Sequence, residues 1–253
     1  MQDVPGAGAE RILLVLASLA HHGKAMSVRE LVGKTGLAQS TLYRQIALLK
    51  RWGFVSEDAG RYAPGPVSLQ LALSFDLGSH LIEASRGAIE RLAQSSGESV
   101  GLVVAVKEQV VCLEMIESLH SLRCSFEKGR AVPLKAGASA KSLLAFMNER
   151  RCADILDTMF AGDEAGRAAL IAQLATIRED GYVVSDSEVD PGVWGVSAPI
   201  FARAGRTSPS VASITLMAPV TRVHGREAAL IDATRRTARN ISRRLQTDRS
   251  NDV

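Results

Sequence analysis

The residues SVRELVGKTGLAQSTLYRQIALLKRWGFVSEDAGRYAPGP, 27 to 66, decide the fold of the amino-terminal part of the chain. Ser27 and Glu30 have the spacing of a capping box, in which each side chain binds a backbone amide at the start of a helix. Gly36 can adopt the positive φ that a tight turn requires. Residues 38–52 then predict a second helix, so the stretch has the pattern of a helix-turn-helix.

The second helix has two chemically different sides. Leu42, Ile46 and Leu49 recur at spacings of four and three, which predicts a buried stripe. The other side carries hydroxyl, amide and guanidinium groups, which a helix-turn-helix presents to the DNA major groove. The candidate DNA-binding residues are Ser27, Gln39, Ser40, Thr41, Tyr43, Arg44, Gln45 and Arg61.

A hairpin is predicted directly after this helix, because two short β-type runs flank a polar turn that ends in Gly60. In that position it forms a wing, from which Arg61 could reach a phosphate. Trp52 and Tyr62 border the junction of helix and wing, and we expect both to be buried. The alternative is a small helical bundle that binds protein, but the polar outward face favours DNA.

The length of 253 residues has room for about two domains. Residues 1–65 hold eight basic and five acidic side chains, residues 66–221 fourteen and eighteen, and residues 222–253 eight and four. The positive excess therefore lies in the two terminal regions. The chain lacks a long uncharged apolar run and a basic leader, so neither a membrane span nor a secretory signal is predicted. Three cysteines without zinc-type spacing predict no disulfide framework and no metal site, which fits a reducing cytoplasm.

Past the break at Pro64-Gly65-Pro66, the apolar run 67–81 predicts a linker helix that packs either on another chain or on its own second domain.

Closely spaced strands and amphipathic helices follow, which predicts an α+β domain with one mostly antiparallel sheet. The expected helices span 83–96, 136–147, 163–180 and 223–245, and the expected strands 99–106, 110–116, 122–126, 181–184, 196–201 and 211–216, with a turn at Gly205-Arg206. The predicted domains are a winged helix-turn-helix over 1–65, a linker helix over 66–81 and a C-terminal domain over 82–253.

A series of motifs in this order resembles the IclR family of transcriptional regulators. They are Arg11 to Leu16, Ser40 to Arg44, Gly60-Arg61-Tyr62, Gly129-Arg130, Val132-Pro133-Leu134, Ala136 to Lys141, Arg178 to Tyr182, Ser185 to Glu188, Pro191-Gly192-Val193 and Val196 to Phe201. The resemblance implies a C-terminal effector domain of the GAF/profilin-like type, which binds a small organic molecule on its sheet. It also implies a double-stranded DNA operator and assembly into homodimers or homotetramers.

The resemblance carries the effector pocket onto Ala138, Ser139, Ser185, Gly195, Thr215 and Met217. Ala138 and Ser139 begin a helix, whose free amides would suit a carboxylate. Family members that bind small acids have polar groups where this chain has Ser185, Gly195 and Met217, so we expect an aromatic or apolar acid. Arg130, Lys135 and Trp194 are candidates for the entrance. Their alternatives are a surface charge for Arg130 and Lys135 and a packing role for Trp194.

Two other functions are alternatives to a transcriptional regulator. An enzyme is disfavoured because His21, His22, His80, His120 and His224 lie outside any catalytic pattern, and the chain lacks nucleophile and phosphate-loop motifs. The other rival is a sensor that does not bind DNA and uses its helix-turn-helix as a dimerisation scaffold. The predicted function is a cytoplasmic DNA-binding regulator without a cofactor, modulated by a small organic effector.

Overall fold

The computed structural model describes residues 8–73, 76–126, 131–203 and 208–250. It divides into two compact units, which meet in the chain between Ser79 and His80. Arg130 and the turn expected at Gly205-Arg206 lie outside the described residues. No helix in the described ranges is long and apolar enough to cross a membrane.

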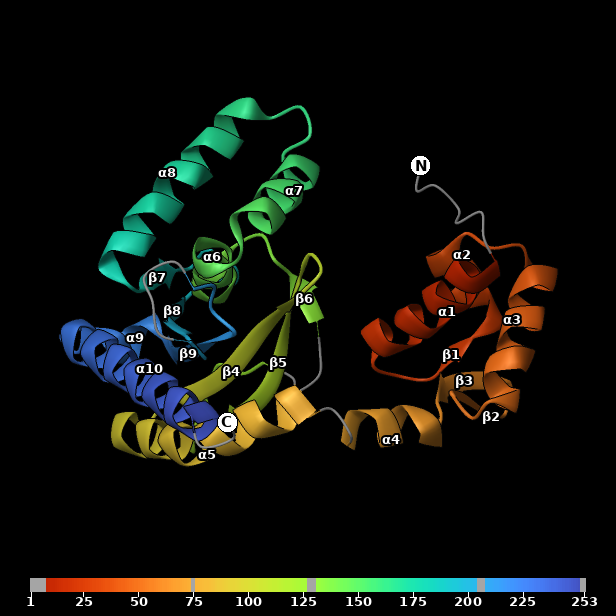
Figure 1. Cartoon of the computed structure of the whole chain (residues 1–253), viewed down its shortest axis with the longest axis horizontal. Coiled ribbons are helices and arrows are strands. Elements are labelled where there is room, and N and C mark those ends of the chain that lie inside the picture. The colour runs from red at the N-terminus through yellow and green to blue at the C-terminus, as the bar shows by residue number, and fades with distance from the viewer. Residues whose placement is uncertain (1–7, 74–75, 127–130, 204–207, 251–253) are drawn as a thin grey trace. The chain divides into compact units, whose positions relative to one another are not determined.

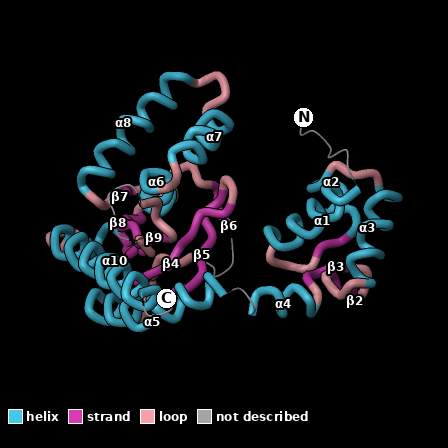
Figure 2. Tube along the Cα trace, in the orientation of Figure 1, coloured by secondary structure: helices cyan, strands magenta, loops and turns pink. Residues whose placement is uncertain are grey.

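The first unit combines helices, cyan in Figure 2, with a small antiparallel sheet in magenta. The strand order of this sheet is β1-β3-β2. Its elements are α1 (Gly8–His22), β1 (Met26–Ser27), α2 (Val28–Thr35), α3 (Gln39–Arg51), β2 (Val55–Asp58), β3 (Arg61–Pro64) and α4 (Pro66–Leu73). The helix-turn-helix and the hairpin are confirmed. The two-residue strand β1 was not predicted, because it is too short to show a pattern.

The local geometry follows the sequence signals. Ser27 Oγ accepts a hydrogen bond from the Glu30 amide, and the Ser27 amide donates to Glu30 Oε2 at 2.7 Å, which completes the capping box. Gly36 ends α2 with a φ of 66°. Leu42, Ile46 and Leu49 are buried against α1 and α2 in one core, as predicted.

The second unit is built on a sheet of order β6-β5-β4-β9-β8-β7, in which every neighbouring pair is antiparallel. Its strands are β4 (Ser99–Val106), β5 (Gln109–Ile116), β6 (Ala131–Pro133), β7 (Val183–Asp186), β8 (Val193–Ile200) and β9 (Ala212–Pro219). Its helices are α5 (Asp76–Ser96), α6 (Gly137–Phe146), α7 (Glu149–Met159), α8 (Glu164–Asp180), α9 (Val220–Val223) and α10 (Glu227–Ser250). The predicted α+β class is confirmed.

Helices cover both faces of this sheet: α5 and α10 on one, α6, α7 and α8 on the other (Figure 1). Strand β9 shows the division, because side chains alternate between faces along a strand. Ile214 and Leu216 enter the core under α5 and α10. Ser213, Thr215 and Met217 therefore face α6, and the polar residues of the central strands gather on that side.

Two predicted elements were wrong. Residues 122–126 form no strand, although their alternating apolar residues imitate one, and β6 takes the edge of the sheet beside β5. The carbonyl of Leu122 instead accepts a hydrogen bond from Arg222 Nη1 at 2.8 Å. The linker helix was expected to continue to residue 81, but α4 ends at Leu73 and a new helix begins at Asp76.

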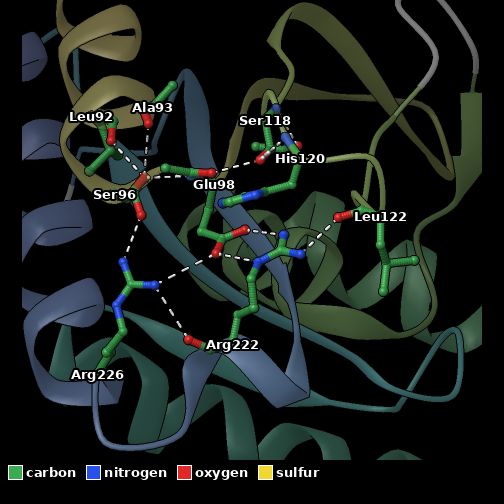
Figure 3. Close-up of polar contacts among 11 residues, drawn as sticks. Leu92, Ala93, Ser96, Glu98, Ser118, His120, Leu122, Arg222 and Arg226 are labelled. Atoms are coloured by element: carbon green, nitrogen blue, oxygen red, sulfur yellow. Dashed lines mark hydrogen bonds and ion pairs between the residues drawn. The ribbon is translucent and has the colours of Figure 1, made fainter.

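A buried ion pair joins segments from opposite ends of the second unit (Figure 3). Glu98 follows α5 and is only 1% exposed. Arg222 in α9 binds both of its carboxylate oxygens, with Nε at 2.8 Å from Oε1 and Nη2 at 2.6 Å from Oε2. Arg226 donates to the carbonyl of Ser96 at 2.6 Å. The pair thereby fixes the end of α5 and the start of β4 to the chain that leads into α10.

We predict that Glu98→Ala lowers the free energy of unfolding by about 3 kcal/mol, because it leaves the Arg222 guanidinium partly buried without a countercharge. Urea denaturation followed by circular dichroism measures the loss. Glu117→Ala is the matched control, since it removes a carboxylate from an exposed pair with Arg123, and should unfold close to wild type. Equal losses in the two variants would contradict a special role for Glu98.

Candidate nucleic-acid interface and effector site

The polar face of α3 lies open to solvent. Gln39, Ser40, Tyr43 and Arg44 are exposed, and Thr41 is half-buried. They lie on the side of the helix opposite Leu42, Ile46 and Leu49, so the structure brings five of the predicted DNA-binding residues onto one accessible surface. Hydroxyl, amide and guanidinium groups of this kind hydrogen-bond to base edges and phosphates.

Gln45 was expected on the outward face of α3, but its side chain is largely buried. The side chain is 5% exposed and lies among the buried residues of α3. Gln45 follows Leu42 by three residues and precedes Leu49 by four, so helical geometry places it in the same stripe. The polarity of Gln45 suggested the outward face, but its spacing from Leu42 and Leu49 along the helix places it on the buried side.

The exposed face continues beyond the predicted residues to Ala47 and Arg51, which sequence reasoning missed. A shallow hollow of about 360 Å³ marks this part of the helix, lined by Arg44, Gln45, Ala47, Leu48 and Arg51. The signal was present, because Ser40, Arg44, Ala47 and Arg51 recur at spacings of four, three and four. Trp52, expected to be buried, is instead 62% exposed, and the Arg51 guanidinium lies 5.9 Å from its ring centroid. Tyr62 is buried as predicted.

Ser27 and Arg61 already have partners within the protein. Ser27 is committed to the capping box. Arg61 donates from Nη2 to the carbonyl of Ala25 at 2.7 Å and to Glu30 Oε2 at 3.3 Å. The hydrogen bonds from Ser27 lower the pKa of Glu30, so this carboxylate stays charged beside Arg61. Both residues therefore brace the start of α2.

The wing is acidic. Glu57 and Asp58 lie at the end of β2, and Glu57 forms an ion pair with Lys50 of α3. The hydrogen bond from Lys50 lowers the pKa of Glu57, which keeps the carboxylate charged. Exposed positive charge in this part of the first unit is consequently found on α3, at Arg44 and Arg51, rather than at the tip of the wing.

The six predicted effector residues also come together, on the sheet face under α6. Ser185, Gly195 and Met217 are direct neighbours across β7, β8 and β9. The amide of Ala138 donates to Ser185 Oγ at 3.0 Å. The hydroxyls of Ser139 and Thr215 lie 2.9 Å apart. All six residues are buried.

Small side chains allow α6 to approach the sheet closely. A Cβ at Gly195 would lie 3.4 Å from Ser185 Oγ and 3.8 Å from Ala138 Cβ, so only ordinary contact distance separates helix and strand. The hydroxyl of Thr215 also bonds that of Ser197. Buried hydroxyls need such partners, and these groups satisfy one another.

The amides at the start of α6 are not free, contrary to expectation. The amide of Gly137 donates to Glu188 Oε2 at 3.1 Å, and that of Ala138 is bound by Ser185. Lys141 completes the arrangement, with Nζ 2.8 Å from Glu188 Oε1. Sequence reasoning missed Glu188 and Lys141 as a pair, because they lie 47 residues apart in the chain and no local spacing connects them.

The structure describes two of the three residues predicted at the entrance of the effector pocket, and these two differ in exposure. Lys135 is exposed. Trp194 is 4% exposed and packs in the core under α5 and α10, on the face of the sheet opposite Gly195, so its packing alternative holds and the entrance role was wrong. Arg130 lies outside the described residues.

Comparison with known protein families covers both units. A model of the IclR helix-turn-helix domain matches residues 8–59, and a model of the bacterial transcriptional regulator IclR C-terminal domain matches residues 77–243. The chain belongs to the IclR family of transcriptional regulators.

Its relatives agree in sequence and fold. The HTH-type transcriptional regulator BhcR of Paracoccus denitrificans is 27% identical over 253 residues, which cover 95% of this chain and 88% of the relative. A crystal structure described as an IclR transcriptional regulator from Silicibacter sp. superposes with a TM-score of 0.82 at 23% identity, over 95% of this chain and 96% of the other. An IclR homologue from Microbacterium hydrocarbonoxydans, complexed with 4-hydroxybenzoate, has a TM-score of 0.76 at 20% identity, over 95% and 100% of the two chains.

This chain is thus a helix-turn-helix transcriptional regulator of the IclR family. Within the described residues, no group of three His, Cys, Asp or Glu side chains is arranged to hold a metal ion. None of the three cysteines forms a disulfide.

We predict that Thr215→Val lowers the free energy of unfolding by about 1–3 kcal/mol, because the buried hydroxyl of Ser139 loses its partner and that of Ser197 keeps only the Ile214 carbonyl. Thermal and urea unfolding measure the change. Thr158→Val is the control, since its exposed hydroxyl bonds only the carbonyl of Asp154 in its own helix. A loss at Thr215 no larger than at Thr158 would show that the hydroxyl cluster does not stabilise the domain.

Proposed function

We propose that this IclR-family protein binds an operator through α3 and that an aromatic or apolar acid, bound between α6 and the sheet, changes its affinity for that operator. The observation that carries the proposal is that each unit has its own polar feature. The first unit has an exposed polar helix face, and the second has a buried cluster of hydroxyls, small side chains and helix amides.

The DNA contacts are assigned to the exposed face of α3. Arg44 has the donor geometry to bind guanine O6 and N7 together, and Gln39 can do the same with adenine N6 and N7. The Ala47 methyl suits contact with a thymine methyl. Arg51 is placed to bind phosphate. This extends the face to residues that the sequence pattern alone did not select.

The effector assignment rests on the groups that meet at the start of α6. The Glu188 carboxylate occupies the position where an acid would be held by the Gly137 amide and Lys141 Nζ, so it marks the chemistry of the site. Gly195 and Met217 offer a small and an apolar neighbour instead of polar anchors. Such a site favours a carboxylate with an aromatic or apolar body, and a homologue of the same fold binds 4-hydroxybenzoate.

The organisation we propose is a winged helix-turn-helix over 1–65, a linker segment over 66–81 that contains α4 and the start of α5, and an effector domain over 82–253. We propose that the protein acts in the cytoplasm as a homodimer or homotetramer. Exposed Leu13, Leu69 and Leu71 support assembly, since they are 64%, 62% and 59% exposed on α1 and α4. An enzymatic role is not proposed, because the buried hydroxyls of Ser139 and Thr215 pair with each other rather than with a base.

We predict that Arg44→Ala weakens operator binding by about 1–3 kcal/mol and relaxes sequence preference at one base pair, because a bidentate contact to guanine is lost. The operator comes from sequencing genomic fragments captured by the purified protein, and fluorescence anisotropy measures affinity on matched and mutated sites. Arg150→Ala, an exposed arginine of α7, is the control. Equal binding by Arg44→Ala and wild type on every site would remove Arg44 from the interface.

We predict that 4-hydroxybenzoate or another aromatic acid raises the melting temperature of the protein, whereas glyoxylate and pyruvate do not. The reason is that Gly195 and Met217 offer contact to an apolar ligand body rather than polar anchors. Neutral 4-hydroxybenzamide is the ligand control and should have no effect. Glu188→Gln should increase the shift at a fixed ligand concentration, since it removes the competing carboxylate. A shift with glyoxylate or pyruvate and none with any aromatic acid would contradict the assignment.

A further inference from the structure

A groove of about 230 Å³ lies between α5 and α10. These two helices cover the face of the sheet opposite α6 (Figure 1). Its walls come from one line of residues on each helix, spaced by three or four. The lining residues are Ala88, Arg91, Leu92 and Ser95 from α5 and Ala233, Arg236, Thr237 and Asn240 from α10. The groove therefore lies outside the effector site between α6 and the sheet.

Two positive charges face this groove from opposite helices. Arg91 and Arg236 are both exposed, and within the described ranges neither guanidinium has a carboxylate partner. The acidic residue one turn before Arg236 is Asp232, which lies 3.9 Å from Arg235 instead. Two unneutralised guanidinium groups lining one hollow create a local positive potential, which an anion would relieve.

The rest of the lining is neutral. Ala88, Leu92 and Ala233 supply apolar atoms. Ser95 and Thr237 donate their hydroxyl protons to carbonyls of their own helices, at 3.2 Å and 2.9 Å, so their oxygens keep lone pairs for a ligand donor. The groove thus combines cations, apolar contact area and hydrogen-bond acceptors.

We propose that this groove is a second ligand site, which binds a small organic anion carrying a carboxylate or a phosphate ester. Arg91 and Arg236 hold the oxyanion from both sides, as guanidinium groups do in charge-assisted, often bidentate pairs. The body of the ligand lies on the alanine side chains. The volume is below the range of about 300–1,000 Å³ for drug-sized ligands, so a metabolite-sized anion fits.

A second copy of the chain is a less suitable occupant. A two-fold contact through this groove brings the same patch of both subunits together, so Arg91 and Arg236 would face their own counterparts. Like charges brought together in this way cost free energy. Charge complementarity therefore favours a small anion over self-association at this face.

The position gives such a ligand a regulatory consequence. Helix α5 begins at Asp76, shortly after α4 ends at Leu73, and it is the element through which the chain enters the second unit. An anion bound to Arg91 and Arg236 joins α5 to α10 and restrains α5. The second site would thus act on the linker independently of the effector under α6.

Arginine side-chain NMR of the full-length protein tests the site, with ¹⁵N-arginine labelling and separate titrations of 4-hydroxybenzoate and glycerol phosphate. Arg91→Gln and Arg236→Gln identify the two Nε–Hε resonances. We expect saturable shifts of both with at least one anion. Calorimetric titration of the same anion, which needs no reporter arginine, should show binding about tenfold weaker or more in the double variant. Arg150→Gln with Arg243→Gln, two exposed arginines outside the groove, removes the same charge and should leave binding unchanged.

Three results would overturn the proposal. The first is the absence of saturable shifts at Arg91 and Arg236 with both anions up to their solubility limits. The second is equal weakening in the control variant, which indicates general charge screening. The third is a change in oligomeric state of the Arg91→Gln, Arg236→Gln protein by analytical ultracentrifugation, which indicates that the groove is an interface between copies.

Discussion

The close approach of α6 to the central strands is the constraint on which the second domain depends. Alternation along β8 and β9 sends the large apolar side chains to one face and the small polar ones to the other. Gly195 and Ala138 remove bulk where helix and sheet meet, and the Ser139 and Thr215 hydroxyls bond across the contact. Buried hydroxyls without partners would be costly. The residues that make this packing possible are also those that could recognise a ligand, so stability and binding share one set of side chains.

Charge is distributed unevenly in the first domain. The wing carries Glu57 and Asp58, and Lys50 is occupied by Glu57, so the available cations on α3 are Arg44 and Arg51. Phosphate contacts fix a protein on DNA, whereas base contacts select a sequence. Because both arginines lie on the same helix face as Tyr43 and Ser40, the proposed phosphate and base contacts would both come from one element. An acidic hairpin beside it disfavours broad contact with the negative backbone.

Periodicity predicted most elements of this fold, because the buried stripes of α3, α5 and α8 repeat at helical spacing and the strands of the sheet are long. Prediction failed where the burial of a side chain does not match its polarity, as for the buried Gln45 and the exposed Trp52. It also failed for 122–126, where an alternating pattern forms no strand. The six effector positions came from family resemblance and were brought together as expected. Their partner Glu188 was not found, nor was the Glu98–Arg222 pair, because contacts between residues so distant in the chain leave no local pattern.

The covalent connection between the two units limits how a ligand can influence DNA binding within one chain. The chain passes between them once, and α5 is the helix that enters the second unit. The end of α5 is fixed through Ser96 and Glu98 to Arg226 and Arg222, next to β9 and the start of α10. Met217 and Thr215 lie on β9 itself and pair directly with β4, the strand that follows α5. If an effector binds at the proposed site, a rearrangement of β9 would reach both ends of the Glu98 ion pair, and a buried pair of this kind resists separation because its charges would lose their partners. The strands and α5 would then move together, and α5 would carry the response toward the linker.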